Sequence, residues 1–449
     1  SVRVTAVSDT TFTLATFNTS NANGQTYVAY VFAHDDQSFG TNSDEAIIKC
    51  GSFTTDSNGF FTVDLGFEPQ WLLYRRYDNG GSPGGGGSHW YMLDINRGYW
   101  TAEKLNWLKA DSTSAEAKYS YQVRPYERGF KSVVNPMHGG NQSLIYMAIR
   151  RPHKPPTAGT EVFKAVQTTS QPVSVGFLTD LIITAETAAG AKYWVPRLTE
   201  NYLTSTATSQ ESAGSSYFKF DQQNSFSTHT FWGSSQNINW YFRRSPGFMD
   251  VVAADYPGSS VAISHNLGVA PELIISKPRD GNVVWMVGSE YLSNTSGWNQ
   301  YLEMHSNAAQ GGTSTIWNQT APTATQFTLG SYPGSSYKGI FYLFATLSGI
   351  SKVGSYSGTG SNINVDCGFT AGARFVMIKR IDSTGDWYVW DSTRGIVSGN
   401  DPYLLLNTTA AQVTNTDYID PLNAGFTVTS SAPTALNTSG GTYLFMAIA

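Results

Sequence analysis

The sequence is poor in charge and in cysteine, and it has no long apolar run. Charged residues make up 14% of the chain, the net charge is −5, and there are two cysteines. A weakly acidic chain gives no electrostatic reason to expect nucleic acid or an anionic membrane as a partner. No run of about 18 apolar residues occurs, so membrane insertion is not expected. These absences exclude the classes of protein that depend on a basic surface or on a membrane-spanning helix.

Motifs that would indicate catalysis or metal binding are also absent. The seven histidines show no His-x-His or His-x-x-x-His spacing, so no zinc site is expected. There is no Gly-x-Ser-x-Gly motif, Walker loop or dinucleotide fingerprint between a strand and a helix. The members of a Ser/His/Asp triad can be far apart in a sequence, and nothing here points to one. We therefore expect no catalytic residues, no metal and no cofactor, and we expect the chain not to be an enzyme.

One strand-like segment of eight residues recurs five times along the chain. The copies are Thr26–Ala33, Ser143–Arg150, Asn237–Arg244, Lys338–Ala345 and Thr442–Ala449. They recur at intervals of about a hundred residues, which is too long for a solenoid repeat and suits one small domain per copy. The chain is therefore predicted to contain four tandem domains, preceded by the end of a fifth.

The residues between these copies indicate an all-β fold. Aromatic residues reach 14%, and glycine, serine, threonine and asparagine are abundant, which favours short strands joined by turns. Apolar runs of four to six residues, such as Leu181–Thr184 and Phe375–Arg380, are bounded by turn residues. The predicted fold is a series of tandem antiparallel β-sandwich domains, jelly-roll-like, of about 100 residues each. Trp90, Trp194, Trp285 and Trp387 are expected to begin the fourth strand of each domain.

The repeat predicts the domain boundaries. Residues 1–40 are expected to hold the closing strands of a preceding repeat, followed by repeat 1 (47–152), a divergent repeat 2 (160–246), repeat 3 (248–348) and repeat 4 (350–449). Because the sequence opens inside a repeat, we expect Ser1 to be the start of a fragment.

The two cysteines occupy positions where a sister repeat has an apolar residue. Cys50 aligns with Val353, and Cys367 aligns with Leu65. Both are therefore expected to be small buried hydrophobic residues and not a disulfide. Free thiols favour assembly in a reducing cytoplasm.

An aspartate and an arginine three residues apart follow the fourth strand in repeats 1 and 4. The pairs are Asp94 with Arg97 and Asp391 with Arg394. Such a pair can lock a turn through a bidentate ion pair, and an isolated carboxylate there could instead serve as a general acid or base. Repeat 3 has Ser289 in place of the aspartate, which favours the structural turn-lock.

Three tryptophans in predicted loops are the candidate binding residues. Trp100, Trp298 and Trp317 lie outside the repeated strand positions. An exposed indole could stack on a sugar ring of a host glycan, and a buried one would cap the end of a sandwich. The glycine-rich stretch Asn79–Ser88 is predicted to be a variable hairpin tip, the kind of segment that often carries recognition.

The best-preserved copy resembles a known family. Repeat 4 reads Phe375–Arg380, then Trp-Tyr-x-x-Asp-x-x-Arg-Gly at Trp387–Gly395, Tyr403–Thr409, Gly425–Val428 and Thr442–Ala449. This pattern resembles an uncharacterised β-domain found, often in tandem, in bacteriophage virion proteins. Repeat 1 matches it reasonably, repeat 3 in part and repeat 2 weakly. The resemblance implies a phage structural protein and brings no catalytic residues with it.

The expected function is that of a non-enzymatic virion structural protein, a tail or head fibre or surface adhesin that contacts the host. The alternatives are a capsid decoration component without a receptor and a polysaccharide-degrading tailspike enzyme. The expected partners are other virion proteins, further copies of the chain with a trimer favoured, and a host-surface glycan or protein. The expected location is the virion, after synthesis in the host cytoplasm.

Overall fold

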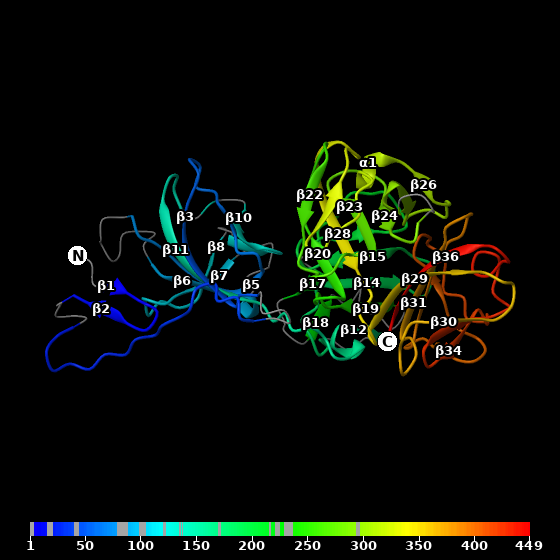
Figure 1. Cartoon of the computed structure of the whole chain (residues 1–449), viewed down its shortest axis with the longest axis horizontal. Coiled ribbons are helices and arrows are strands. Elements are labelled where there is room, and N and C mark those ends of the chain that lie inside the picture. The colour runs from blue at the N-terminus through cyan, green and yellow to red at the C-terminus, as the bar shows by residue number, and fades with distance from the viewer. Residues whose placement is uncertain are drawn as a thin grey trace. The chain divides into compact units, whose positions relative to one another are not determined.

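A computed structural model describes most of the chain, and its described residues divide into two compact units. The described residues are 4–15, 21–39, 45–78, 89–97, 105–119, 123–133, 136, 138–168, 172–214, 217–220, 225–228, 237–292 and 297–449. The units are Ser1–Cys50 and Gly51–Ala449 (Figure 1). Among the described residues, no helix is both long and apolar enough to cross a membrane.

In the first unit, a short hairpin is the only paired structure of more than one bridge among the described residues. Strands β1 (Val4–Val7) and β2 (Phe12–Leu14) pair antiparallel. The predicted closing strand Thr26–Ala33 is wrong, because these residues lie outside any strand. In each of the four later repeats the closing strand is second in a sheet of five or more strands and has a neighbour on each side. Within this unit, β1 and β2 pair with each other and neither pairs with Thr26–Ala33.

Repeat 4 shows the fold most completely, as two antiparallel sheets. The larger sheet has the order β29 (Ser351–Ser357), β36 (Thr442–Ile448), β31 (Phe375–Arg380), β32 (Trp387–Asp391) and β33 (Leu404–Leu405). The smaller has the order β30 (Ile363–Asp366), β35 (Gly425–Val428) and β34 (Ile419–Leu422). One core cluster joins residues of both sheets, among them Val376 and Phe426. The predicted all-β, sandwich-type fold is confirmed.

The larger sheet has the same strand order in the other three repeats. In repeat 1 it is β3 (Ile48–Thr54), β11 (Ser143–Arg150), β5 (Pro69–Arg76), β6 (Tyr91–Asp94), β7 (Leu105–Lys109) and β8 (Ala117–Tyr119). In repeat 2 it is β12 (Phe163–Val166), β19 (Asn237–Phe242), β14 (Leu181–Glu186), β15 (Lys192–Pro196) and β16 (Leu203–Thr204). In repeat 3 it is β20 (Met249–Val252), β28 (Ser335–Phe344), β23 (Leu273–Pro278), β24 (Met286–Ser289), β25 (Gln300–Glu303) and β26 (Gly311–Gly312), with β21 (Asp255–Pro257) also pairing with β28.

The smaller sheets and the few helical turns complete each repeat. The smaller sheets are β4 (Thr62–Asp64), β10 (Gly129–Ser132) and β9 (Val123–Tyr126) in repeat 1, β13 (Val173–Ser174), β18 (Ser225–Thr228) and β17 (Phe218–Lys219) in repeat 2, and β22 (Val261–Ser264) with β27 (Gln326–Leu329) in repeat 3. The described helices are one α-helical turn, α1 (Ser314–Trp317), and the 3-10 turns η1 (Ile95–Arg97), η2 (Gly159–Glu161) and η3 (Gly297–Asn299).

The third strand of repeat 4 shows why these sequences are continuously apolar. In β31, Val376 and Ile378 face the smaller sheet and belong to the core of their own repeat. Phe375 and Met377 alternate with them and belong to a different cluster, which contains residues of repeats 2, 3 and 4. A strand buried on both faces needs apolar residues at every position. Repeats 2 to 4 therefore share a common core between their larger sheets.

Aromatic rings from the three repeats meet in this shared core. The ring centroid of Phe375 lies 5.3 Å from that of Phe163 and 6.0 Å from that of Phe242. Phe242 lies 6.2 Å from Phe344 of repeat 3. In Figure 1, strands of all three repeats gather at the centre of the body that holds the C-terminus.

Three equivalent backbone hydrogen bonds close repeats 2, 3 and 4 into a ring. They are Glu211 N to Arg279 O at 2.7 Å, Gln310 N to Ile381 O at 2.9 Å and Gln412 N to Thr187 O at 2.8 Å. Each acceptor lies six residues after the first residue of β14, β23 or β31, and each donor lies eight residues after the buried leucine of β16, β25 or β33. The bonds run from repeat 2 to 3, from 3 to 4 and from 4 to 2. The three repeats therefore have a cyclic, pseudo-threefold arrangement.

The expected alignment of Trp194 with the other strand-opening tryptophans is wrong by two residues. Trp194 pairs with Ile183 and Leu203, whereas the matching position in repeat 4 is Val389. Lys192 occupies the position of Trp387, and its amine donates to the carbonyl oxygens of Gly190 and Ala410. The divergence of repeat 2 hid this two-residue difference.

Candidate functional site: a buried arginine–carboxylate network

Three arginines and three carboxylates form a buried network where repeats 1, 2 and 3 meet. Its members are Glu68 and Arg151 from repeat 1, Asp180, Arg197 and Arg244 from repeat 2, and Asp250 from repeat 3. All lie at strand ends or next to them: Glu68 precedes β5, Arg151 follows β11, Asp180 precedes β14, Arg197 follows β15, Arg244 follows β19 and Asp250 is in β20. The formal charges balance.

Asp180 is the most heavily hydrogen-bonded member of the network. Arg151 donates to both of its carboxylate oxygens, at 2.7 and 2.8 Å. Arg197 donates to Oδ1 from Nη2 at 2.6 Å and from Nε at 3.1 Å. The backbone N–H of Arg244 donates to Oδ2 at 2.7 Å. Forked guanidinium–carboxylate contacts of this kind are among the strongest hydrogen bonds in proteins, and they fix the relative orientation of the groups.

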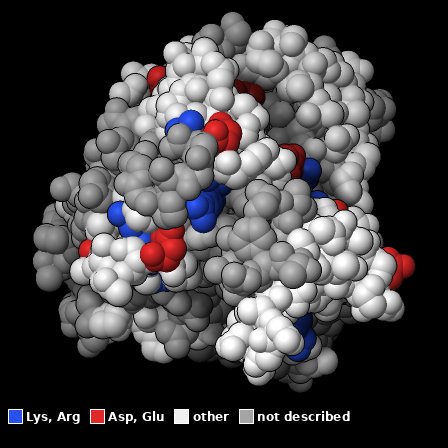
Figure 2. All heavy atoms as spheres, turned by 90° about the vertical axis from the view of Figure 1, so that its left-hand side faces the viewer, with Lys and Arg blue, Asp and Glu red and all other residues white. Residues whose placement is uncertain are grey.

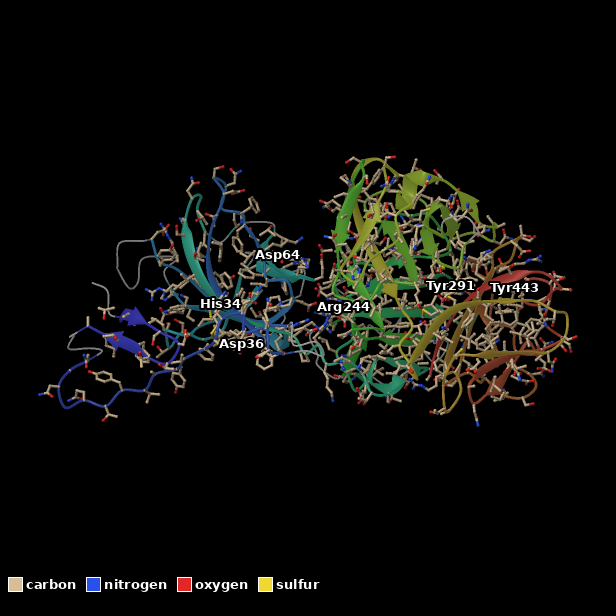
Figure 3. The ribbon with its side chains drawn as sticks, in the orientation of Figure 1. His34, Asp36, Asp64, Arg244, Tyr291 and Tyr443 are labelled. Atoms are coloured by element: carbon tan, nitrogen blue, oxygen red, sulfur yellow. The ribbon has the colours of Figure 1, made fainter. Side chains whose placement is uncertain are left out.

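Glu68 and Asp250 extend the network into the neighbouring repeats. Glu68 accepts from Arg197 at 2.7 Å and also from Arg244, and Arg244 donates from Nε to Asp250 at 2.6 Å. The second oxygen of Asp250 accepts from the backbone N–H of Asn266 at 2.7 Å. Figure 3 labels Arg244, which lies between repeat 1 and the other repeats. One guanidinium therefore contacts carboxylates of two other repeats.

The pKa shifts of Asp180 and Arg244 follow from burial and from their ion-pair partners. Burial alone would raise the pKa of Asp180, but Arg151 and Arg197 reverse this effect and hold it well below its usual value. Burial alone would lower the pKa of Arg244, but Asp250 and Glu68 raise it above its usual value. Both groups stay ionised at neutral pH, as a buried ion pair requires. The network is suited to structural attachment, since its central carboxylate Asp180 and its bridging guanidinium Arg244 are both held in their charged forms.

Glu127 lies beside the network in a different environment. Its side chain is buried, its Oε2 has no hydrogen-bond partner among the described residues, and burial raises its pKa to about 7. Asn266 of repeat 3 donates to the Glu127 carbonyl oxygen at 2.9 Å. His153 lines the same small pocket, and burial followed by the charges of Arg150 and Arg151 lowers its pKa well below its usual value. Burial therefore favours the neutral form of both Glu127 and His153, which disfavours a charged acid–base couple between them.

A second cavity, of about 190 Å³, borders the network on the side of repeat 2. Its lining includes Gln70, Ile95, Phe177 and Arg243. Pockets that hold small-molecule ligands are typically about 300–1,000 Å³, so this cavity is smaller than a usual ligand site. Among the described residues, no group of three or more His, Cys, Asp and Glu side chains is placed to hold a metal ion.

The two Asp–Arg pairs predicted as turn-locks are each in contact. Arg97 Nε donates to Asp94 Oδ2 at 2.6 Å, and its backbone N–H donates to Oδ1 at 3.1 Å. Arg394 makes the same contacts with Asp391, at 2.6 and 3.0 Å. Asp391 also accepts from the indole N–H of Trp240 at 3.0 Å, and Arg394 stacks on the Trp240 ring. In repeat 4 the pair thus joins two repeats, a role that the sequence analysis did not foresee.

The expectation of exposed, ligand-stacking indoles is wrong for Trp298 and Trp317. They are 5% and 1% exposed, and their rings pack edge to face at 5.8 Å inside repeat 3. Gly288 of β24 explains why: it occupies the register position of Trp390, and a side chain there would collide with both indoles. The two loop tryptophans fill the space that the strand tryptophan fills in repeat 4. Trp100 and the tip Asn79–Ser88 lie outside the described residues.

The two cysteines are free thiols with different burial. Cys367 is buried, and burial raises its pKa to about 12. Cys50 is only half-buried. The expectation of a buried hydrophobic position holds for Cys367 and only in part for Cys50.

The sequence carried one signal of the network that the analysis did not use. Two copies of the closing strand end in a pair of arginines, Arg150-Arg151 and Arg243-Arg244, and the other copies do not. A basic pair after an apolar strand, with Asp180 before the third strand of repeat 2, indicates charges that meet at one sheet end. Glu68 and Asp250 could not be assigned, because their partners are in other repeats.

A family model covers most of the chain. No curated protein matches the sequence. A family model described as a domain of unknown function (DUF7483) matches residues 1–152 and 241–449, and it leaves out most of the divergent repeat 2. Because these two segments make up most of the sequence, the chain belongs to the DUF7483 family.

Proposed function

We propose that the chain is a non-catalytic structural protein of a bacteriophage virion, a tail or head fibre or surface adhesin that contacts the host. The observation that carries this proposal is the closed ring of repeats 2 to 4, with its shared core and three equivalent hydrogen bonds. Domains joined this way cannot move as flexible beads. A particle appendage that transmits force or presents a binding surface needs this stiffness.

The arginine–carboxylate network supports the same role. It joins repeat 1 to the ring through ion pairs whose side chains are at most 6% exposed. Breaking such a buried pair by removing one partner is costly, so repeat 1 is attached by more than its peptide linker. The charged side chains are thus used to hold repeats together.

The surface adds a further argument. Figure 2 shows acidic and basic side chains of the described residues in small groups of mixed sign, among many uncharged atoms. With 14% charged residues, such a surface favours contacts with neutral polar partners, for example host glycans, over long-range electrostatic attraction. The resemblance of the repeat 4 motifs to virion β-domains supplies the class of particle.

Particles purified from the virus that encodes the sequence test the proposal. We expect peptides of the chain by mass spectrometry, and we expect gold-labelled antibodies against the chain to mark the tail or the head in electron micrographs. Saturable binding of the purified chain to host cells would then distinguish an adhesin from a decoration component. Absence of the chain from particles that contain the other virion proteins would overturn the proposal.

The enzymatic alternative is tested separately. A tailspike enzyme would release oligosaccharides from host surface polysaccharide, whereas an adhesin binds the same material without products. Chromatography of the polysaccharide after incubation with the chain separates the two. We expect an unchanged size distribution.

A further inference from the structure

Repeat 1 leaves one face of its larger sheet half-open. In β5, β6, β7 and β11 most of the side chains that face the smaller sheet are buried, for example Leu72 and Leu93. The alternating side chains on the opposite face are apolar as well, but they are only half-buried: Trp71, Leu73, Met92, Leu108, Met147 and Ile149. We call these six residues the open face. A contiguous apolar face that is left partly open is typical of a contact surface.

The matching face is fully covered in the sister repeats. Strand register equates Trp71 with Phe375 and Ile149 with Ile448, and it equates Met92 with Val389. In repeat 4 these side chains are at most 1% exposed and belong to the shared core of the ring. The cover is supplied by the same faces of two other repeats. The structure therefore shows what this type of face binds: two more repeats of its own kind.

Repeat 1 also keeps the polar groups that close the ring. Trp285 and Trp387 donate their indole N–H groups to the carbonyl oxygens of Thr204 and Glu303 in the preceding repeat, each at 3.0 Å. Trp90 occupies the same position in repeat 1, and no described residue accepts a hydrogen bond from its indole N–H.

The backbone donor of the ring also has a counterpart. Glu211, Gln310 and Gln412 each lie eight residues after the leucine of the fifth strand, and Glu116 lies eight residues after Leu108. The acceptor position corresponds to Tyr77, which is 57% exposed. Both sides of the ring-closing contact are thus present and exposed in repeat 1.

We infer that the open face of repeat 1 is an assembly surface that binds the same face of two further copies of this chain. Three copies of repeat 1 close a homotypic ring that repeats the internal ring of repeats 2 to 4. Trp90 of each copy donates to the Lys109 carbonyl of one neighbouring copy, and its Glu116 N–H donates to the Tyr77 carbonyl of the other neighbour. This inference rests on the internal pseudo-symmetry and does not depend on the virion role.

The internal ring also identifies the residue nearest the symmetry axis. Phe242 and Phe344 hold equivalent positions in repeats 2 and 3, and their ring centroids are 6.2 Å apart. The equivalent residue of repeat 1 is Ile149. In the trimer, the Ile149 side chains of different copies therefore come close to one another.

Sedimentation velocity of the full chain over a concentration series is the first test. We expect a species of three times the protomer mass. Leu73→Glu places a charge at the centre of the open face and should weaken assembly at least about a hundredfold, because an unpaired buried charge opposes association. The matched control is Thr62→Glu, on an exposed position of β4, which should leave the trimer unchanged. Near-ultraviolet circular dichroism confirms that both variants stay folded.

A cross-linking measurement gives an independent answer. In a Cys50→Ser chain, Ile149→Cys should form disulfide-linked dimers when a mild oxidant is added, and Thr62→Cys should not. A chain that stays monomeric at tens of micromolar, or equal weakening by Leu73→Glu and Thr62→Glu, would overturn the inference. So would a trimer in which Ile149→Cys gives no cross-link.

Discussion

Repeats 1 and 4 have the same strand order and nearly the same motifs, but only repeat 4 has its larger sheet covered on both faces. Phe375, Val389 and Ile448 are at most 1% exposed, whereas their counterparts in repeat 1 are half-buried. The Asp391–Arg394 pair is bound by Trp240 of another repeat, and the Asp94–Arg97 pair is partly exposed. The comparison shows that one strand order can be left half-open or fully covered according to its neighbours.

The difference also shows how the ring is built from a common unit. Repeat 2 has diverged most in sequence, and yet its contacts with repeats 3 and 4 obey the same cyclic rule. Lys192 reaches a carbonyl oxygen of repeat 4, as Trp387 reaches one of repeat 3. The lysine can replace the tryptophan because the contact needs only an N–H donor, which the Lys192 amine supplies in place of an indole. Repeat 1 has the equivalent donors, but among the described residues no two repeats of the same chain pack on the open face of its larger sheet.

The largest expected effect is a difference in the free energy of unfolding when the equivalent aromatic side chain is truncated to alanine in repeat 4 and in repeat 1. Phe375→Ala should lower the free energy of unfolding by about 3–5 kcal/mol, since it leaves a cavity in a closed core. Trp71→Ala should cost less than about 2 kcal/mol, because a half-exposed ring loses less buried area. Denaturant unfolding of both variants in the Leu73→Glu background, which keeps the open face uncovered, measures the difference. Equal losses would mean that repeat 1 is covered within one chain.

The next effect is a pH dependence that comes from Glu127 of repeat 1. Glu127 is buried against repeat 3, whereas Asn423 at the matching turn of repeat 4 is exposed. Its folded pKa of about 7 exceeds the usual 4.5, so its stabilising contribution is full below pH 4.5 and is lost as the pH rises through 7. The loss amounts to about 3 kcal/mol.

Glu127→Gln should remove this loss. The variant and the parent should have similar stability near pH 4.5, and the variant should be the more stable above pH 7. Denaturant unfolding across this pH range checks the expectation, with Glu290→Gln on an exposed position of repeat 3 as the control. A parent-to-variant difference that does not change with pH would contradict it.

The smallest effect concerns a single indole donor. Trp387→Phe removes the hydrogen bond to the Glu303 carbonyl and should cost about 1 kcal/mol beyond the change in packing. Trp90→Phe in a Leu73→Glu monomer should cost less than about 0.5 kcal/mol, because it removes no such bond. In the trimer, Trp90→Phe should weaken assembly instead. Thermal unfolding and sedimentation of the same two variants separate these outcomes.

Much of the fold could be predicted from the closing strands and the apolar runs. The segment Phe375–Arg380 contains no polar residue before Lys379. This indicates a strand that is buried on both faces, but it does not indicate which residues cover the strand. The residues of the candidate site were harder to predict from the sequence. Asp94 and Asp391 were found from the spacing of their arginines, whereas Glu68, Asp180 and Asp250 meet only across repeat boundaries.

Two expectations failed for reasons that lie outside the local sequence. Trp298 and Trp317 are in loops, and they became core residues because Gly288, at a strand position, left space for them. Thr26–Ala33 has the pattern of a closing strand and forms none, because no described strand in its unit pairs with it. In both cases the outcome depends on residues that are distant in sequence.

The sequence by itself determined the all-β class, the hundred-residue period and the two turn-locking pairs, because strand alternation and short ion-pair spacing are local properties. Only the tertiary structure decided that repeats 2 to 4 close into a ring, that a charge network attaches repeat 1 and that one face of repeat 1 stays half-open. Those features depend on which apolar faces and which charges meet across repeats, and neither hydrophobic burial nor ion pairing specifies its partner from one segment alone.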